Sequence, residues 1–127
     1  MNLPEDDEAY LGGKGYRWRL LPDGEGALLV IDGFTVNGER YDRASADLMI
    51  RIPPQYNMAQ LDMWYLDPPL RLKGSSVYPD RADTFEAHGG RNWQRFSRHL
   101  PSGAWRAGVD GLPMFFNFII EELRRSP

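Results

Sequence analysis

Four short segments in the first half of the chain have the spacing of hydrophobic residues that is typical of β-strands. Strict alternation indicates a strand with one buried face, and a short unbroken apolar run indicates a strand buried on both faces. The pattern predicts strands at Tyr16–Leu20, Ala27–Ile31, Asp47–Ile52 and Asp62–Leu66. Because turn and proline signals separate these segments, such as Pro22-Asp23-Gly24, we expect a four-stranded antiparallel meander.

Two helices are expected, one at each end of the chain. Four acidic residues, Glu5 to Glu8, open the first, since acids in a first turn face the positive end of the helix dipole. Pro113 can occupy the first turn of the second, and the wide apolar stripe that continues to Leu123 predicts a helix packed on the sheet. From about Lys73 to Gly111 no clear period is present, which predicts a long irregular loop that is functional or partly disordered. This order of elements indicates an α+β fold.

Composition narrows the classes of protein that the sequence can encode. A chain of 127 residues is expected to form a single domain over residues 1–127, with a core that needs no disulfide or metal. The absence of cysteine excludes disulfides, cysteine-ligated metals and a thiol nucleophile. The net charge of −3 argues against a nucleic-acid partner, and no apolar run approaches the ~18–20 residues of a membrane span. The acidic start of the chain does not resemble a secretory signal. We therefore expect a cytoplasmic protein without nucleic-acid or membrane partners.

The segment between the third and fourth predicted strands carries a more specific pattern. It reads Ile50-Arg51-Ile52-Pro53-Pro54-Gln55-Tyr56 and is followed by Asp62-Met63-Trp64-Tyr65. Ubiquitin-conjugating enzymes have a strand, a proline, a tyrosine, a short loop and an aromatic-containing strand in this order, and the chain resembles them over nearly its whole length. Further along, Gly89–His99 is similar to a signature of the bacterial branch found beside ubiquitin-like proteins, activating enzymes and deconjugating peptidases.

This resemblance implies a fold, an activity and a set of partners. The fold of these enzymes, called the UBC fold, has an N-terminal helix, a four-stranded meander sheet, an active-site loop and a C-terminal helix. The implied activity passes the C-terminus of a ubiquitin-like protein from an activating enzyme to a target, and it calls for no cofactor and no metal. Two features depart from the family pattern: no Pro-Asn pair follows His88, and the catalytic cysteine is absent.

Serine is the residue that can replace the missing thiol. In the family the cysteine stands eight positions before a tryptophan, and counting back eight positions from Trp105 leads to Ser97. A serine hydroxyl needs a general base, and His99 is the local candidate because residues i and i+2 of an extended segment point to the same side. His88 is the second candidate, and the chain has no other histidine. We therefore expect the Ser97 oxygen within hydrogen-bonding distance of a nitrogen of one of them.

Basic residues surround this serine in the sequence. No acid stands between Glu86 and Asp110, and four cationic side chains lie in that interval: Arg91, Arg95, Arg98 and Arg106. Such a patch suits a developing oxyanion or the acidic surface of a partner, so Arg91, Arg95 and Arg98 are candidate binding residues. Asp110 is a candidate for orienting a histidine or an incoming amine. Trp93 and Trp105 are expected to pack the loop on the sheet and so preorganise the site.

Three functions remain open at this point. The first is a conjugating enzyme that carries the modifier's C-terminus as an oxyester of Ser97. An oxyester is a poorer acyl donor than a thioester, so the departing oxygen needs general-acid assistance, commonly worth ~10²–10⁴-fold. The second is a catalytically inactive UBC-fold module that docks a ubiquitin-like protein or its activating enzyme. The third, an unrelated serine hydrolase, is disfavoured because the sequence has no Gly-x-Ser-x-Gly nucleophile elbow.

Overall fold

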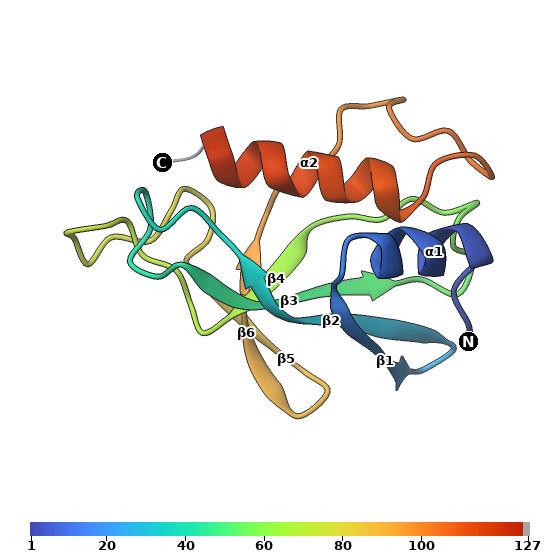
Figure 1. The fold of residues 1–127 in the computed structure, drawn as a ribbon, viewed down its shortest axis with the longest axis horizontal. Helices are drawn as coiled ribbons and strands as arrows, with labels where there is room; N and C mark the ends of the chain where they lie inside the picture. Colours follow the sequence, from blue (N-terminus) through green and yellow to red (C-terminus); the bar gives the residue numbers. More distant parts are fainter. Residues whose placement is uncertain (126–127) are drawn as a thin grey trace.

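The computed structural model describes residues 1–125. Their elements are α1 (Glu5–Gly13), β1 (Arg17–Asp23), β2 (Gly26–Thr35), β3 (Ser45–Ile52), β4 (Trp64–Asp67), β5 (Thr84–His88), β6 (Arg91–Phe96) and α2 (Leu112–Arg125). The described strands form one antiparallel sheet in the order β1-β2-β3-β4-β6-β5. Both helices lie on one side of this sheet, and the β5–β6 hairpin extends away from them (Figure 1). The α+β class is as expected, but the predicted count of four strands is wrong because the described sheet has six.

The two additional strands lie inside the segment predicted to be irregular. A two-residue turn at Gly89 and Gly90 joins β5 to β6, and both glycines have positive φ, 60° and 80°. Tight hairpin turns whose twist matches that of the strands require positive φ at both central residues. A Cβ on Gly89 would also lie 3.0 Å from Leu28 Cδ1, so the turn closely approaches the sheet. The consequence for function is that His88 and Arg91 lie at the ends of paired strands rather than in a loop.

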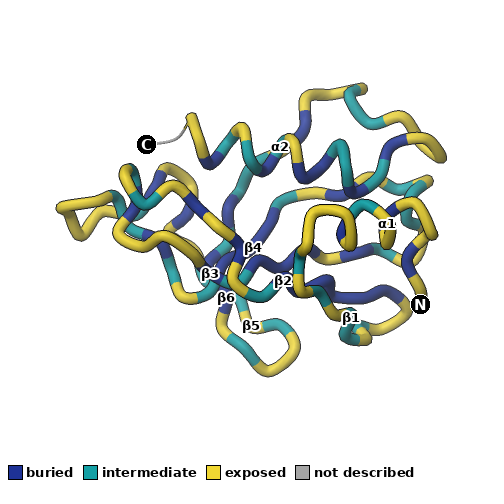
Figure 2. Tube along the Cα trace, in the orientation of Figure 1, coloured by how far each residue is buried: buried dark blue, intermediate teal, exposed yellow. Residues whose placement is uncertain are grey.

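The main core lies between the sheet and α2. The predicted apolar stripe is present, because Phe115, Phe116 and Ile119 of α2 are fully buried against the inward side chains of the strands. Figure 2 shows the burial concentrated on the central strands and on the sheet-facing side of α2. Trp64 of β4 lies in the middle of this core, stacked on Phe96 of β6 with ring centroids 5.9 Å apart. The ring pair attaches the end of β6, and therefore the residues that follow it, to the core.

The opposite face of the sheet carries a smaller buried cluster. Its members are Leu28, Val30, Met49, Tyr65 and Trp93. Paired residues of an antiparallel sheet project to the same side, and alternate residues of a strand do likewise. The pairing of Tyr65 with Arg95, and of Glu86 with Trp93, therefore sets Arg95 and Glu86 on this same face. We refer to it below as the outer face.

None of the helices in residues 1–125 is both long enough and apolar enough to cross a membrane.

Candidate functional site

Ser97 is the first residue after β6. Its backbone N–H donates to the carbonyl oxygen of Arg81 at 3.1 Å, and its side chain is half-buried. The hydroxyl oxygen accepts a hydrogen bond from Nε of Arg95 at 3.0 Å. Because Ser97 follows Arg95 by two residues in extended chain, its side chain projects toward the outer face. The nucleophile candidate is thus in contact with a guanidinium group.

Glu86 is at the centre of the contacts around Arg95. One carboxylate oxygen, Oε2, accepts from Nη1 of Arg95 at 2.7 Å. The other, Oε1, lies 2.8 Å from Nε2 of His88 and accepts from the hydroxyl of Tyr65 at 3.1 Å. These donors come from three adjacent strands, β4, β5 and β6. A continuous chain of contacts therefore runs from Ser97 through Arg95 and Glu86 to His88, which we call the Ser97 network.

The electrostatics of this network favour an ionised carboxylate. The hydrogen bond from His88, with those from Arg95 and Tyr65, lowers the pKa of Glu86 below its ordinary value, and the partial burial of the carboxylate opposes this only in part. Burial, together with the nearby charge of Glu86, raises the pKa of Tyr65, so its hydroxyl stays protonated and remains a donor. Hydrogen bonds of this charge-assisted kind are roughly twice as strong as neutral ones.

His99 pairs with a different carboxylate. Its Nδ1 lies 2.8 Å from Oδ1 of Asp62, just before β4, and the histidine side chain is 56% exposed. A neutral histidine that donates its Nδ1 proton to a carboxylate has Nε2 unprotonated and able to accept a proton. In that tautomer the accepting nitrogen of His99 is the one that does not contact Asp62.

The expected hydrogen bond between Ser97 and a histidine is not formed among residues 1–125. His88 contacts Glu86, His99 contacts Asp62, and Arg95 donates to the Ser97 oxygen instead. The sequence placed the serine and the histidines close together along the chain, but the strand pairing interposes Arg95 and Glu86 between Ser97 and His88.

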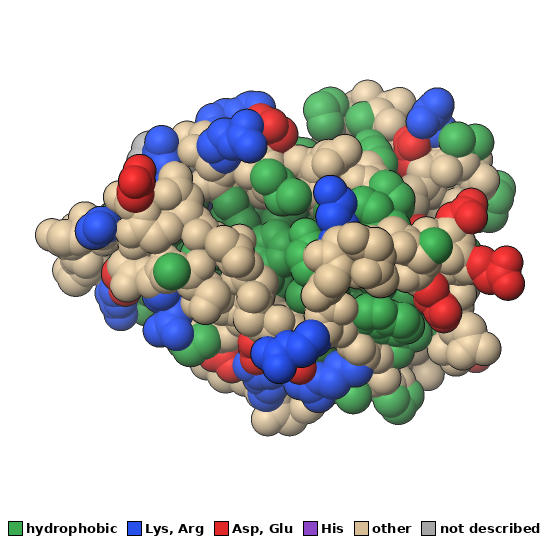
Figure 3. Space-filling view, viewed as in Figure 1, with side chains coloured by type: hydrophobic (Ala, Val, Ile, Leu, Met, Phe, Trp, Pro, Cys, Tyr) green, Lys and Arg blue, Asp and Glu red, His purple; other side chains and the backbone are tan. Residues whose placement is uncertain are grey.

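Each of the four arginines expected to form a basic patch lies close to a carboxylate. Arg91 pairs with Asp47 and Asp67 at 3.0 and 2.8 Å, and Arg98 Nε lies 4.0 Å from Glu122. The remaining members of the set have carboxylate partners as well: Arg95 with Glu86, and Arg106 with Asp110. Figure 3 shows basic and acidic side chains adjoining along the lower edge of the molecule. Three of these acids, Asp47, Asp67 and Glu122, come from elsewhere in the chain, and the other two, Glu86 and Asp110, are the ends of the acid-free interval.

Asp110 and Trp105 belong to a separate cluster before α2. The Asp110 carboxylate accepts from the backbone N–H of Arg106 at 2.8 Å and from its Nη2 at 2.9 Å, and these hydrogen bonds lower the pKa of Asp110. The Trp105 indole N–H donates to the carbonyl oxygen of Asn57 at 3.0 Å, and Asn57 Nδ2 donates to the Asp110 carbonyl. The carboxylates that contact the two histidines are therefore Glu86 and Asp62, rather than Asp110.

Trp93 packs in the way the sequence suggests. It is buried on the outer face, and its indole N–H donates to the carbonyl oxygen of His88 at 3.1 Å. The guanidinium of Arg91 lies 4.3 Å from the centre of the ring. These contacts fix the hairpin that carries His88 and Glu86, so the tryptophan preorganises the Ser97 network without contacting Ser97.

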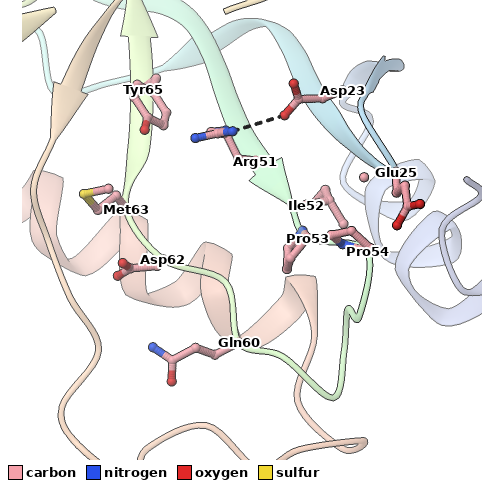
Figure 4. Close-up of a pocket in the computed structure, with 11 residues that line it drawn as sticks. Asp23, Glu25, Arg51, Ile52, Pro53, Pro54, Gln60, Asp62, Met63 and Tyr65 are labelled. Carbon is pink, nitrogen blue, oxygen red and sulfur yellow. Dashed lines mark hydrogen bonds and ion pairs between the residues drawn. The ribbon is translucent and has the colours of Figure 1, made fainter. Parts of the chain in front are cut away.

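An open groove of about 390 Å³ adjoins this network (Figure 4). Tyr65 and Met63 form one wall, and Arg51 stands opposite, in an ion pair with Asp23 at 3.3 Å. Asp62 also lines the groove. Two of these lining residues are shared with the contacts described above, since Tyr65 donates to Glu86 and Asp62 holds His99.

Three residues of the site were not identified from the sequence: Tyr65, Glu86 and Asp62. Glu86 and His88 are two residues apart, so they share a face if their segment is a strand. The following Gly89-Gly90 pair is the sequence signal that this segment forms a hairpin. Nothing local connects Asp62 with His99, which are 37 residues apart. Among residues 1–125, no cluster of three or more His, Asp or Glu side chains is arranged to hold a metal ion.

Comparison with protein families places these residues in a wider context. The family described as "Prokaryotic E2 family E" matches residues 3–126. Among curated proteins and among solved structures, none matches the chain. The matched range includes every residue of the Ser97 network and both histidine–carboxylate pairs.

Proposed function

The chain belongs to prokaryotic E2 family E, and from this premise we propose that it carries the C-terminus of a ubiquitin-like protein as an oxyester on Ser97. Membership confirms the resemblance to bacterial ubiquitin-conjugating-enzyme-like proteins and gives the chain a role of the ubiquitin-conjugation type. The proposed partners are a ubiquitin-like protein and its activating enzyme. With no cysteine in the chain, the acyl carrier has to be a different side chain.

One observation carries this proposal: the hydroxyl oxygen of Ser97 accepts a hydrogen bond from the paired guanidinium of Arg95. A surface serine without a catalytic role needs no such donor. An oxygen on which negative charge develops during a reaction is stabilised by a hydrogen-bond donor. The register relative to Trp105 and the Asp62–His99 pair two residues beyond Ser97 give further support.

Loading is a substitution at the carbonyl carbon of the modifier's C-terminus. Ser97 Oγ attacks this carbon, a carbon–oxygen bond forms, and the bond to the leaving group supplied by the activating enzyme breaks with its electron pair. The hydroxyl proton passes to Nε2 of His99, which is the accepting nitrogen while Nδ1 donates to Asp62. His99 then becomes a cation paired with a carboxylate, which stabilises the product of the proton transfer.

Transfer reverses these roles. A nucleophile of the target, such as an amine, attacks the ester carbon, and the carbon–Oγ bond breaks with its electron pair on Ser97. The protonated His99 returns a proton to Oγ, and the proton lost by the amine replaces it on the histidine. General-acid assistance of this kind commonly contributes ~10²–10⁴-fold.

A docking module without catalytic activity is the second candidate. It is favoured by the absence of cysteine and by the lack of a direct contact between Ser97 and either histidine among the described residues. In that case Arg95 would only connect the end of β6 to β5. The two candidates predict different outcomes when the chain meets a charged activating enzyme.

The test is formation of an adduct in the presence of the activating enzyme, ATP and the ubiquitin-like protein. We expect a wild-type adduct that survives a thiol reductant, is cleaved by mild hydroxide, and is absent with Ser97→Ala. The matched control is Ser102→Ala, since Ser102 is exposed in the turn after Pro101, and it should leave the adduct unchanged. An adduct that persists in Ser97→Ala, or no adduct with wild type while binding is retained, would favour the docking module.

A further inference from the structure

The guanidinium of Arg95 is held at two of its edges. Nε donates to Ser97 Oγ at 3.0 Å, and Nη1 donates to Glu86 Oε2 at 2.7 Å. A guanidinium is planar and its donors are fixed relative to one another, so restraining one edge also orients the other. The direction in which Nε–H points at the serine oxygen is therefore set by the position of Glu86.

Glu86 is itself restrained from outside this pair. His88 and Tyr65 both contact its second oxygen, at 2.8 and 3.1 Å, and the two rings pack edge to face with centroids 5.2 Å apart. The side chains of Arg95 and Glu86 are 31% and 29% exposed, so solvent screens this ion pair less than it screens a fully exposed one. Such a carboxylate has little freedom to release the arginine.

We infer that Arg95 is a catalytic residue acting on the Ser97 oxygen and that Glu86 is the positioning residue that aims it. The inference rests on the proposed function of Ser97. During transfer, the carbon–Oγ bond breaks and its electron pair develops on Oγ; the Nε–H of Arg95 then donates to an oxygen with increasing negative charge. Arg95 transfers no proton, because a guanidinium stays protonated in proteins. The proton that Oγ finally receives comes from the general acid.

During loading the same contact orients the hydroxyl. A serine hydroxyl has one donor hydrogen and two acceptor positions. With one acceptor position occupied by Arg95 Nε–H, the hydrogen and the remaining lone pair point away from the guanidinium, which leaves them available to a base and to the incoming carbonyl carbon. Glu86 contributes to both half-reactions only through Arg95.

Chemical rescue separates this role from a purely structural one. In Arg95→Ala, we expect single-turnover transfer to an amine to slow by about 10²–10³-fold, which is the usual effect of removing one oxyanion donor. Millimolar guanidinium ion should restore part of the rate by occupying the vacated position. The rescue should be lost in Arg95→Ala combined with Glu86→Gln, because the neutral amide no longer holds the added cation. Glu86→Gln alone should slow transfer by about 10- to 100-fold.

The matched control is Arg19→Ala. Arg19 forms an exposed ion pair with Asp32 at 3.6 Å on the outer face, far along the sheet from β6. This variant should retain wild-type rates and show no response to guanidinium ion. Thermal unfolding midpoints measured for every variant identify any that is not folded. If Arg95→Ala is not folded, Arg95→Lys is used, and it should slow transfer because an ammonium cannot reach both partners in the same geometry.

The outcomes distinguish the inference from the proposed function. If Ser97→Ala still forms the base-labile adduct, the proposed function is refuted. If Ser97→Ala abolishes the adduct while the Arg95 and Glu86 variants react at wild-type rates, only the inference is refuted. Rescue that is equally strong with and without the Glu86 carboxylate would remove the positioning role of Glu86 and leave Arg95 as the catalytic group.

Discussion

Substitution of Asp7 tests how a buried carboxylate affects the free energy of unfolding of this protein. The residue lies in α1 and its side chain is 4% exposed, yet its carboxylate accepts from the Tyr56 hydroxyl at 2.5 Å and from the backbone N–H of Leu112 at 3.3 Å. The first turn of α2 is therefore capped by a residue 105 positions away in the chain. A Cβ on Gly111 would lie 2.9 Å from the Asp7 carboxylate, so only glycine leaves room for this contact.

Burial raises the pKa of Asp7 above its ordinary 3.8, and the hydrogen bonds from Tyr56 and Leu112 offset this only in part. A folded-state pKa above the unfolded value means that the folded protein holds the proton more tightly. The stabilisation from the protonated form is then fully present below pH 3.8 and is lost as the pH rises through the folded-state pKa. Each unit of difference between the two pKa values corresponds to about 1.4 kcal/mol.

Two substitutions at Asp7 separate the charge from the hydrogen bonds. Asp7→Ala leaves the buried N–H of Leu112 and the partly buried hydroxyl of Tyr56 without an acceptor, and at about 1–3 kcal/mol for a fully buried donor this predicts a loss of up to about 6 kcal/mol in the free energy of unfolding. Asp7→Asn keeps an amide oxygen as acceptor and removes the buried charge, so it should be far less destabilising than Asp7→Ala. Relative to wild type, Asp7→Asn should become more favourable as the pH rises from 3 to 7.

The assay is urea unfolding followed by tryptophan fluorescence, with wild type, Asp7→Asn and Asp7→Ala compared at a series of pH values between 3 and 7. The difference between the free energies of unfolding of wild type and Asp7→Asn removes the contributions of all other titrating groups, because both proteins contain them. If wild type gains stability over Asp7→Asn as the pH rises, the pKa of Asp7 is lowered in the folded state and the reasoning is refuted. Equal effects of the two substitutions would show that the hydrogen bonds carry no net stability.

Three further predictions concern the turn, the core and the base. Gly89→Ala should destabilise the protein by about 1–2 kcal/mol in urea unfolding, because its φ of 60° is unfavourable for alanine and its Cβ would meet Leu28 at 3.0 Å; no loss would contradict the tight turn. Phe115→Ala should cost about 3–5 kcal/mol by the same measurement, as the ring is fully buried, and a loss below 1 kcal/mol would argue against the packing of α2. Asp62→Asn should slow loading of Ser97 in a single-turnover assay because the neutral amide no longer stabilises the cation that His99 becomes when it takes the serine proton, while thermal stability stays unchanged; an unaltered rate would contradict the role of the Asp62 carboxylate.

The local pattern of side chains was enough to predict most of the secondary structure. Strands β1 to β4 and helix α2 were found where alternation and the apolar stripe indicated them, with boundaries that differ by a few residues. The largest of these differences is in β2, which continues to Thr35 past an irregularity between Ile31 and Phe34, where Gly33 has a φ of 65°. The local periodicity of hydrophobic residues indicates which face of an element is buried. It predicts these strands and the helix because burial of that face stabilises them.

The β5–β6 hairpin was missed for a physical reason. Apart from Trp93, its outer-face positions are polar or charged, among them Thr84, Glu86, His88 and Arg95, so alternation of hydrophobicity is weak even though alternation of side-chain direction is strict. What stabilises these strands is the ladder with β4 and the pairing of charges across strands, and neither is visible in a hydrophobic pattern. The glycine pair at the turn was the local signal available.

From the sequence alone came the family resemblance, the absence of a thiol, and the choice of Ser97 and the two histidines as candidate catalytic side chains. The tertiary structure decided their partners: Arg95 for Ser97, Glu86 for His88, and Asp62 for His99. The reason is that electrostatic and hydrogen-bonding energies depend on distance in space, and a sheet brings residues tens of positions apart into contact while separating residues that are close along the chain.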